Sequence, residues 1–485
     1  MSASALEGAP TTERGKPGSG STQPPEPWTL RLFARRHPWW SAWIVLGLIS
    51  AALVLWARTR PGFDPYGWLT WGQQTITASL DTNAAPSWKP LPYLFTVPFA
   101  LAGHYQLYLW MFTAVAVSLS GLLFAGLIVH RLTGPVAHPR AALAAGVFTA
   151  LALAGIQEYW HYILSAQSDP MIVALCLGAI YCHLSDRPRC AFVLGALAAL
   201  GRPEVWPFIG LYGLWMWVRI PSTRWLVASG GVLLLLLWFG IPALTSRTPF
   251  VAASNAMDSG RALRGNKVFG TIGRFLQIND WPLEVAALLA VVIAAVRRDK
   301  VTLTLAAGIV VWVVVEIGFA LHGWPGLARY MFEAGGVLVV LAGVGVGRLL
   351  SDAPALVRAP SWAGVVLVVL LVAGVAPWAV SQARAEHKDL REQRLRTLEI
   401  NDLHSVVIGL GGAARIRGCG ESLTRLEYQT MLAWTLHVNV AKIGYKYAQS
   451  IGRGNPIVLF TPYPTGVGWK VQALHQGSPA CRSLP

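Results

Sequence analysis

The stretch that decides the fold is Trp39–Trp68, WWSAWIVLGLISAALVLWARTRPGFDPYGW. Its first part, 39–57, is apolar over a length that can cross a lipid bilayer as an α-helix. Arg35 and Arg36 stand just before it, so the positive-inside rule keeps the N-terminus in the cytoplasm and sends the helix outward. Asp64 then opens the first outer segment. The stretch therefore predicts a multi-pass membrane protein with an acidic residue at its outer face.

The composition agrees with a membrane protein. Of the 485 residues, 54% are hydrophobic and 13% are charged, against about 25% charged residues in an ordinary soluble protein. The mean hydropathy is +0.48. These values exclude a disordered chain, a collagen-like chain and a conventional soluble enzyme. The net charge of +16 would suggest nucleic acid in a soluble protein, but we attribute it to Lys and Arg in cytoplasmic loops and expect no nucleic-acid partner.

Similar apolar runs recur along the chain and predict an all-α domain of about eleven transmembrane helices over residues 39–380. Two longer segments, 58–104 and 245–281, are expected as outer loops. Residues 190–218 form a pair of runs too short to cross unaided, so this pair is either re-entrant or changes the count by one pass. The other expected spans are 39–57, 105–130, 141–156, 170–184, 225–244, 283–296, 301–320, 330–349 and 362–380.

The two ends of the chain differ from this apolar middle. Residues 1–38 are expected to be a disordered cytoplasmic segment, and residues 381–485 a small extracytoplasmic α/β domain. Cys419 and Cys481 bracket most of that domain, and an extracytoplasmic location would let them form a disulfide. Within it we expect a charged helix at 381–400, a strand-like piece ending at Cys419, an amphipathic run at 424–437 and strands at 456–461 and 468–474.

Two aspartates are the first candidates for chemistry. Asp64 and Asp169 each precede a proline at the expected outer end of a span. Each can be a helix N-cap, because Asp before a Pro at the first helical position is a common helix start. The alternative is a carboxylate at the outer mouth of the bundle that acts as a general base. Glu158 and His161 would share a face with Asp169 if residues 157–169 were helical, and a divalent cation there is left open.

Several cations accompany these carboxylates. Arg329, followed by Tyr330, opens a late span, where its planar guanidinium suits a lipid phosphate; the alternative is a pair with Glu333 at i+4. Lys89 lies in a rigid Pro-rich piece and can meet an anionic headgroup or be an ordinary interfacial lysine. Arg202 and Glu204 flank a proline inside apolar sequence, so we expect them to pair with each other or with outer-loop groups. Glu316 lies within a span and must face the bundle interior or a cavity.

Taken in chain order, these features resemble the GT-C superfamily of integral-membrane glycosyltransferases, which use polyprenyl-phosphate-linked sugars outside the cytoplasmic membrane. The resemblance covers about residues 39–350. The first loop departs from the family pattern, because it has a single Asp followed by Pro rather than paired acidic residues. High Ala, Gly, Arg and Trp usage is typical of an actinobacterial protein. The matching features are Asp64, the run Lys89–Tyr93, Asp169, the break Gly201–Glu204, and Arg329 with Tyr330.

The resemblance implies a hexosyl- or pentosyltransferase of the plasma membrane. A polyprenyl-phosphate sugar would be the donor, and a cell-envelope glycan, lipid or protein the acceptor. Asp64 would take the acceptor proton, Arg329 would stabilise the leaving phosphate, and Asp169 would position the acceptor, the base or a metal. Attack from the opposite face would invert the anomeric carbon. No cofactor is certain, and a divalent cation stays open.

Two other function classes fit part of the sequence. A transporter or flippase of a lipid-linked or anionic substrate could line its path with the same Arg and Asp residues. Against it, the polar residues gather at the expected outer face and not at the midplane, where transporters bind; Glu316 is the main exception. A structural cell-envelope protein would use 381–485 as its interaction module.

Overall fold

The structure is a computed structural model that describes residues 37–135, 137–258, 260–357, 362–464 and 467–474. Contacts divide the chain into two units, one ending at Val45 and the other beginning at Leu46. The described part of the first unit is the beginning of helix α2, where the Ser41 hydroxyl donates to the His37 carbonyl at 3.1 Å. Every feature below lies in the second unit.

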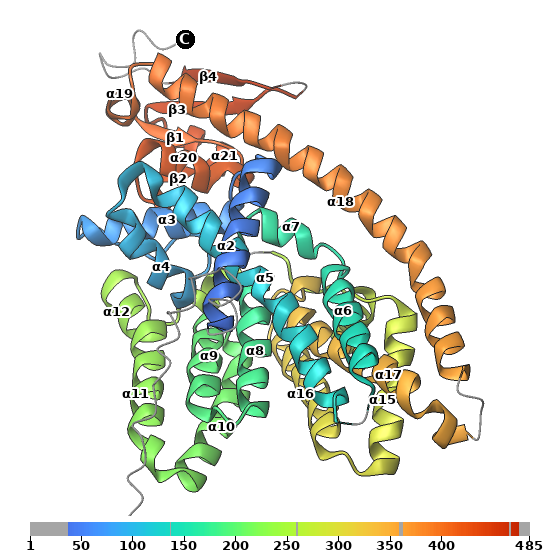
Figure 1. Cartoon of the computed structure of the whole chain (residues 1–485). Coiled ribbons are helices and arrows are strands. Elements are labelled where there is room, and N and C mark those ends of the chain that lie inside the picture. Colours follow the sequence, from blue (N-terminus) through green and yellow to red (C-terminus); the bar gives the residue numbers. More distant parts are fainter. Residues whose placement is uncertain (1–36, 136, 259, 358–361, 465–466, 475–485) are drawn as a thin grey trace, which may run out of the picture. The chain divides into compact units, whose positions relative to one another are not determined.

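The elements follow one another in chain order, coloured from blue to red in Figure 1. The first half of the chain contains α2 (Pro38–Ala57), α3 (Phe63–Ile76), α4 (Pro90–Ala100), η1 (Gly103–Tyr105), α5 (Gln106–Thr133), α6 (Pro139–Ala154), α7 (Tyr159–Leu164), α8 (Asp169–Leu184), α9 (Pro188–Gly201), η2 (Pro203–Val205), α10 (Trp206–Arg219), η3 (Pro221–Thr223), α11 (Arg224–Leu235), the π-helical η4 (Leu236–Gly240) and α12 (Ile241–Thr245). The second half contains α13 (Val251–Met257), α14 (Lys267–Gln277), α15 (Trp281–Arg297), α16 (Lys300–Leu321), η5 (Ala328–Met331), α17 (Phe332–Val357), α18 (Ala363–Gly409), α19 (Ala413–Cys419), β1 (Glu421–Leu423), η6 (Leu426–Tyr428), α20 (Gln429–Leu436), η7 (Val440–Lys442), β2 (Ile443–Gly444), α21 (Tyr447–Gly452), β3 (Ile457–Pro462) and β4 (Trp469–Leu474).

The expected count of about eleven spans is not confirmed. Within the described residues, six helices are long and apolar enough to cross a membrane, or seven if α14 and α15, bent by 97°, count as one span. Helices do form near the other expected positions, but α6 and α8 have 16 residues and α9 has 14, which is short for a bilayer crossing. The six are Pro38–Ala57, Gly103–Thr133, Pro221–Thr245, Lys300–Leu321, Ala328–Ser351 and Ala363–Gly409.

Helix α17 is central to the bundle and packs against α5, α6, α8, α15 and α16. Glycines make the closest approaches between helices. A Cβ on Gly345 of α17 would lie 2.4 Å from the Ala286 carbonyl of α15, and one on Gly126 of α5 would lie 3.0 Å from the Gly146 carbonyl of α6. Small residues let helix backbones come this close, as is common within membranes.

The expected first outer loop is built around α3 and α4. Aromatic side chains fill the space between them: Trp71 and Trp88 are buried with ring centroids 5.1 Å apart, and Trp88 also packs against Tyr93. Gly72 of α3 meets the Thr96 carbonyl of α4, where a Cβ would lie at 2.4 Å. This packing gives the residues at the beginning of α3 a rigid support.

The last part of the chain forms a small α/β domain, as expected. Its sheet has the order β2-β1-β3-β4, with β1 parallel to β2 and β3, and β3 antiparallel to β4. The strand expected to end at Cys419 is wrong: those residues form the short helix α19, consistent with the Ala and Arg residues in it. Cys419 is buried there, but Cys481 lies outside the described residues, so the disulfide stays a prediction.

Candidate functional site

Asp64 is the second residue of α3, whose N-cap is Gly62. The capping role considered for Asp64 is therefore not observed, because a capping side chain stands immediately before its helix. The carboxylate instead faces Arg329, with 3.6 Å between Oδ2 and Nη2. The Asp64 side chain is 20% exposed, more than the other carboxylates paired at this site. It is thus the acid that an entering molecule reaches first.

Asp169 has a different environment. It is the first residue of α8, after the N-cap Ser168, and its side chain is fully buried. Its carboxylate accepts a hydrogen bond from Arg202, and its Oδ2 lies 3.8 Å from Nη1 of Arg329. With two guanidinium groups beside it, this carboxylate is suited to holding cations in place more than to receiving a proton.

Arg329 connects the two aspartates. It lies on the short helix η5, with 12% of its side chain exposed, and one guanidinium reaches Asp64 and Asp169 through different nitrogens. Glu333, the partner considered at i+4, pairs with Arg202 instead, at 3.3 Å between Nε and Oε1. Helical spacing alone thus gave the wrong partner, because the aspartates come from segments distant in sequence.

Arg202 is the centre of a buried charged cluster at the break between α9 and η2. It is 2% exposed and pairs with Asp169, with Glu333 and, as expected, with Glu204, whose Oε1 lies 3.6 Å from Nη1. A lone buried charge is costly, so these partners explain how Arg202 is tolerated. Glu316, 3% exposed, interacts electrostatically with the same cluster and faces the bundle interior, as expected.

Lys89 stands beside the aspartates, directly before α4. Its Nζ lies 3.4 Å from the Ser168 hydroxyl and 5.7 Å from the centre of the Trp68 ring. Burial lowers the pKa of Lys89 below its usual value, and the nearby Asp169 opposes this effect. A second cation therefore stands near Arg329 with no carboxylate in direct contact among the ion pairs described.

Two tyrosines stack on the guanidinium groups. Tyr330 lies 4.3 Å from Arg202 and 5.7 Å from Arg329, measured from each guanidinium carbon to the ring centre. Tyr162 of α7 lies 5.5 Å from Arg329 in the same sense, and burial raises the pKa of Tyr162 to about 12. Both rings limit the positions open to the Arg329 guanidinium.

Glu158 and His161 do not join this group. The chain is not one helix over 157–169, because α7 ends at Leu164 and Ala166 adopts a positive φ of 54° before α8 begins. The face that Glu158, His161 and Asp169 were expected to share therefore does not form. His161 instead pairs with Asp389 of α18, at 2.8 Å between Nδ1 and Oδ1, and Glu158 is exposed.

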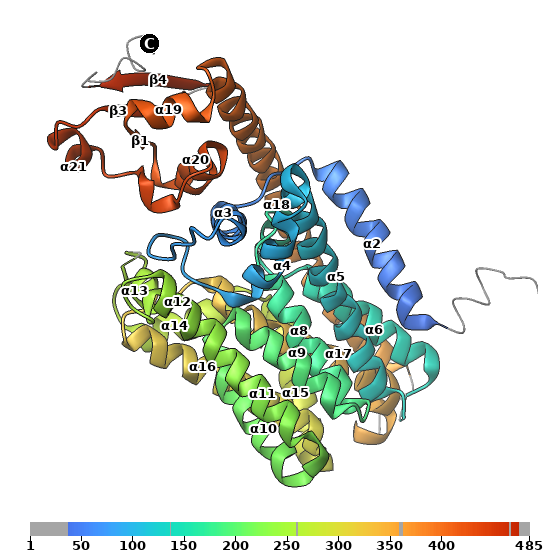
Figure 2. The ribbon, with the colours of Figure 1, turned by 90° about the vertical axis from the view of Figure 1, so that its left-hand side faces the viewer.

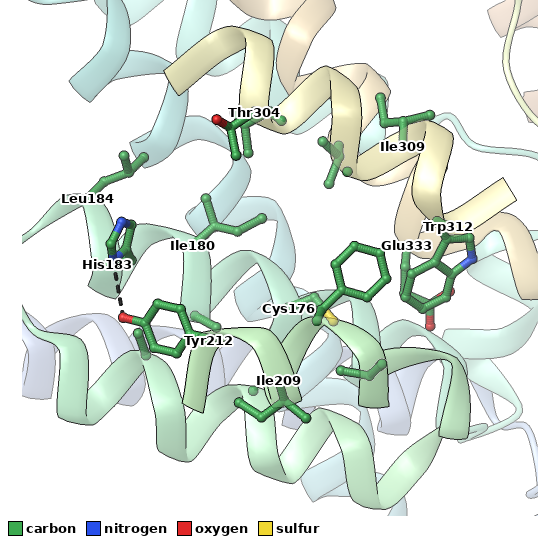
Figure 3. A pocket seen from close by; sticks show the side chains of 18 of the residues that line it. Cys176, Ile180, His183, Leu184, Ile209, Tyr212, Thr304, Ile309, Trp312 and Glu333 are labelled. Atoms are coloured by element: carbon green, nitrogen blue, oxygen red, sulfur yellow. Dashed lines mark hydrogen bonds between the residues drawn. The ribbon is translucent and has the colours of Figure 1, made fainter. Parts of the chain in front are cut away.

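A mostly apolar cavity of about 440 Å³ extends from the charged cluster between α8, α10, α16 and α17. Figure 3 shows Glu333 and Trp312 together at one end and His183 with Tyr212 toward the other. His183 Nδ1 and the Tyr212 hydroxyl are 3.1 Å apart. The cavity has the volume and lining to hold an apolar chain, with one end of that chain next to the buried charged residues.

The described residues contain no group of three or more His, Cys, Asp or Glu side chains arranged to hold a metal ion. The cationic groups Lys89 and Arg329 are the features of the site that suit an anionic ligand. The question of a divalent cation stays where the sequence left it.

Sequence reasoning found Asp64, Lys89, Asp169, Arg202, Glu204, Arg329 and Tyr330, which lie together, but it missed Tyr162 and Ser168. Tyr162 lies in the short segment expected outside between two spans. A tyrosine at a membrane interface was the one feature that could have marked it as a candidate. Ser168 directly precedes Asp169 and had no distinguishing pattern.

No family model matches the chain, and no curated protein matches it in sequence. Among solved structures, ArnT from Cupriavidus metallidurans bound to undecaprenyl phosphate has a TM-score of 0.54 at 15% identity, over 88% of this chain and 93% of that one. Its apo state gives 0.51 at 16% identity, over 87% and 93%. The Archaeoglobus fulgidus oligosaccharyltransferase AglB, in complex with an inhibitory peptide and a dolichol-phosphate, gives 0.50 at 11% identity, over 86% and 65%.

These similarities are at the level of fold. ArnT and AglB are GT-C superfamily members, so the expected GT-C-like fold, mostly helical with a small sheet near the C-terminus, is confirmed. The comparisons give no support for the expected actinobacterial origin.

Proposed function

We propose that the chain is a membrane glycosyltransferase that moves a sugar from a polyprenyl-phosphate donor to a cell-envelope glycan, lipid or protein. The observation that carries the proposal is a partly exposed carboxylate, Asp64, 3.6 Å from a guanidinium, Arg329, that also pairs with a buried aspartate. Two structures of similar fold contain undecaprenyl phosphate or dolichol-phosphate, which supports a donor of this class.

The transfer needs one base and one cationic site. An acceptor hydroxyl gives its proton to Asp64, and its oxygen bonds to the anomeric carbon of the donor sugar. The bond from that carbon to the phosphate oxygen breaks, and the electron pair leaves with the polyprenyl phosphate. Arg329 and Lys89 stabilise the charge that appears on the phosphate. Attack opposite the leaving group inverts the anomeric carbon.

Arg329 links donor binding to the base. Without a ligand, its guanidinium lies 3.6 Å from the Asp64 carboxylate. A donor phosphate competes for the same exposed edge of the guanidinium, while Asp169 keeps hold of the buried edge. The donor phosphate would therefore bind directly beside Asp64, the proposed base.

The apolar cavity suits the prenyl chain. It begins at Glu333 and Trp312, next to the charged cluster that holds Arg329, and runs between α8, α10, α16 and α17. Burying isoprene units there would stabilise donor binding in proportion to the apolar area covered. We place the site at the outer face of a plasma membrane, with residues 1–38 cytoplasmic and 381–485 extracytoplasmic, because the basic short loops fall on the other side.

A transfer assay tests the function. Purified protein in lipid is offered a panel of radiolabelled polyprenyl-phosphate hexoses and pentoses with a crude cell-envelope acceptor. The parent should move label from one donor class, which names the sugar. Asp64→Asn should lower the rate by about 10²–10⁴-fold, the usual contribution of a general base.

Asp81→Asn is the matched control, because Asp81 lies in the same loop and bonds only to its neighbour Asn83 among the contacts of its side chain described. It should retain the parent rate. Parent-like transfer by well-folded Asp64→Asn would exclude Asp64 as the base. No transfer from any donor by folded parent protein would favour the transporter alternative, which a flux assay in vesicles then examines.

A further inference from the structure

The residues just before Asp64 are held by three different parts of the chain. The Pro61 carbonyl accepts a hydrogen bond from Arg396 of α18. The Gly62 amide donates to the Ser165 carbonyl, between α7 and α8, at 2.8 Å. The Phe63 carbonyl accepts from the Thr430 hydroxyl of α20 at 2.7 Å. Three successive backbone groups are therefore fixed from outside α3.

Thr430 is the second residue of α20, so its helix offers no carbonyl four residues before it and its hydroxyl is available to bond elsewhere. Threonine hydroxyls in helices commonly bond the carbonyl four residues earlier, and Thr435 of the same helix does so, with Met431 at 2.9 Å. Thr430 reaches across to α3 instead, and it is fully buried. Helix α3 has no side-chain cap at Gly62, and these bonds fix the backbone where the helix begins without capping its N–H groups.

The C-terminal domain also holds the far end of α3. The Asn439 amide donates to the Gln74 side chain at 3.1 Å and to the Asp81 carbonyl at 3.0 Å. Between the two ends, Tyr66 packs against Trp434 with ring centroids 6.3 Å apart. Figures 1 and 2 both show α20 beside α3, with α18 leading to the domain.

We infer that residues 381–464 and 467–474 form a clamp that positions the Asp64 carboxylate, with Thr430 and Arg396 as positioning residues for the transfer reaction. The inference rests on the proposed function and gives the C-terminal domain a part in it. Because a misplacement of about 1 Å can cost about 10²-fold in rate, loosening the carbonyl next to Asp64 should lower kcat. It should not weaken donor binding, because Asp169 still holds Arg329 and Lys89 contacts Ser168.

Two measurements on the full-length protein in lipid test this. The first is hydrogen exchange of peptides covering residues 61–66, which needs no turnover. The second is the split between kcat and donor KM with the donor that the panel identifies. Thr430→Val removes the hydroxyl at nearly constant volume, Thr430→Ser keeps it, and Thr435→Val is the matched control in the same helix.

We expect Thr430→Val to speed hydrogen exchange in residues 61–66 and to lower kcat by about 10–100-fold without raising the donor KM. Thr430→Ser and Thr435→Val should behave like the parent. Arg396→Gln should also speed exchange and lower kcat. Arg417→Gln should do neither, because Arg417 bonds the Leu436 carbonyl within the C-terminal domain.

Unchanged exchange in folded Thr430→Val would overturn the clamp, and so would faster exchange with parent-like kcat. An equal loss in Thr435→Val would show general damage to α20 and also count against it. Failure of the proposed function looks different: the parent itself has no turnover, while the exchange data still decide whether the clamp exists.

Discussion

Asp64 and Asp169 show how two residues with the same local sequence acquire different properties. Both precede proline, yet one side chain is 20% exposed and the other is fully buried between two arginines. Local sequence could not separate them, because the difference comes from Arg202 and Arg329, which are far away along the chain. The general presence of carboxylates and cations at one end of the helices was predictable. Their pairing was not, except for Arg202 with its neighbour Glu204.

Lys89 gives a prediction on pH. Burial lowers its pKa, so it loses its proton at a lower pH than an ordinary lysine. Only the protonated form attracts a phosphate, so donor affinity should fall as the pH rises toward that lowered value. In Lys89→Arg the charge persists, because arginine stays protonated, and this part of the pH dependence should disappear.

The test is to measure the donor KM of the parent and of Lys89→Arg across the alkaline pH range. The Lys89→Arg profile serves as the control, because its side chain keeps its charge across this range. Identical KM profiles in the two proteins would remove Lys89 from phosphate binding.

Among the elements, α3 and α4 depend on a close backbone approach. A methyl group on Gly72 would lie 2.4 Å from the Thr96 carbonyl and 2.7 Å from Gln106 Nε2. Gly72→Ala must therefore push the two helices apart, at a cost of about 1–3 kcal/mol. We expect a lower thermal midpoint in detergent and reduced transfer, because α3 carries Asp64.

Gly273→Ala is the control for this prediction. Gly273 also lies inside a helix, but a Cβ there meets nothing within 4 Å. Alanine should leave the midpoint unchanged or raise it, because glycine is the poorer helix former. A parent-like midpoint in Gly72→Ala would show that α3 and α4 can separate without cost.

The cavity can be tested on helix α16. Gly308 lines it and has open space for a side chain, so Gly308→Leu should fill part of it and raise the KM for long-chain donors. Donors with one or two isoprene units should be unaffected. Gly318→Leu, on the same helix with similar free space but away from the cavity, is the control. An equal KM change for short and long donors would place the prenyl chain elsewhere.

For the whole molecule, hydropathy predicted where helices form but not how many cross the membrane. Each expected span has a helix near it, yet α6, α8 and α9 are too short to satisfy the length criterion alone. Which segments connect the apolar runs near the site was predictable as well. What could not be predicted is that the C-terminal domain reaches back to α3, because no pattern in 424–437 specifies a partner in 61–74.

Membrane orientation is the prediction at this scale. In a Cys190→Ser background, Lys470→Cys on β4 should react with an impermeant thiol reagent in intact cells. Asp186→Cys, whose position between α8 and α9 is 98% exposed, should react only after permeabilisation. The two sites are each other's control, and reversed labelling would place the candidate site in the cytoplasm.

Helix α18 runs from Ala363 to Gly409 as one element of 47 residues. Its buried positions in the second half recur every three or four residues, so they form one stripe: Leu390, Gln393, Thr397, Ile400, Leu403 and Val407. One residue added upstream would turn that stripe by about 100° and carry Arg396 away from Pro61. The rotation of α18 about its own axis thus determines whether Arg396 reaches the backbone beside Asp64, although the two residues are far apart in the sequence.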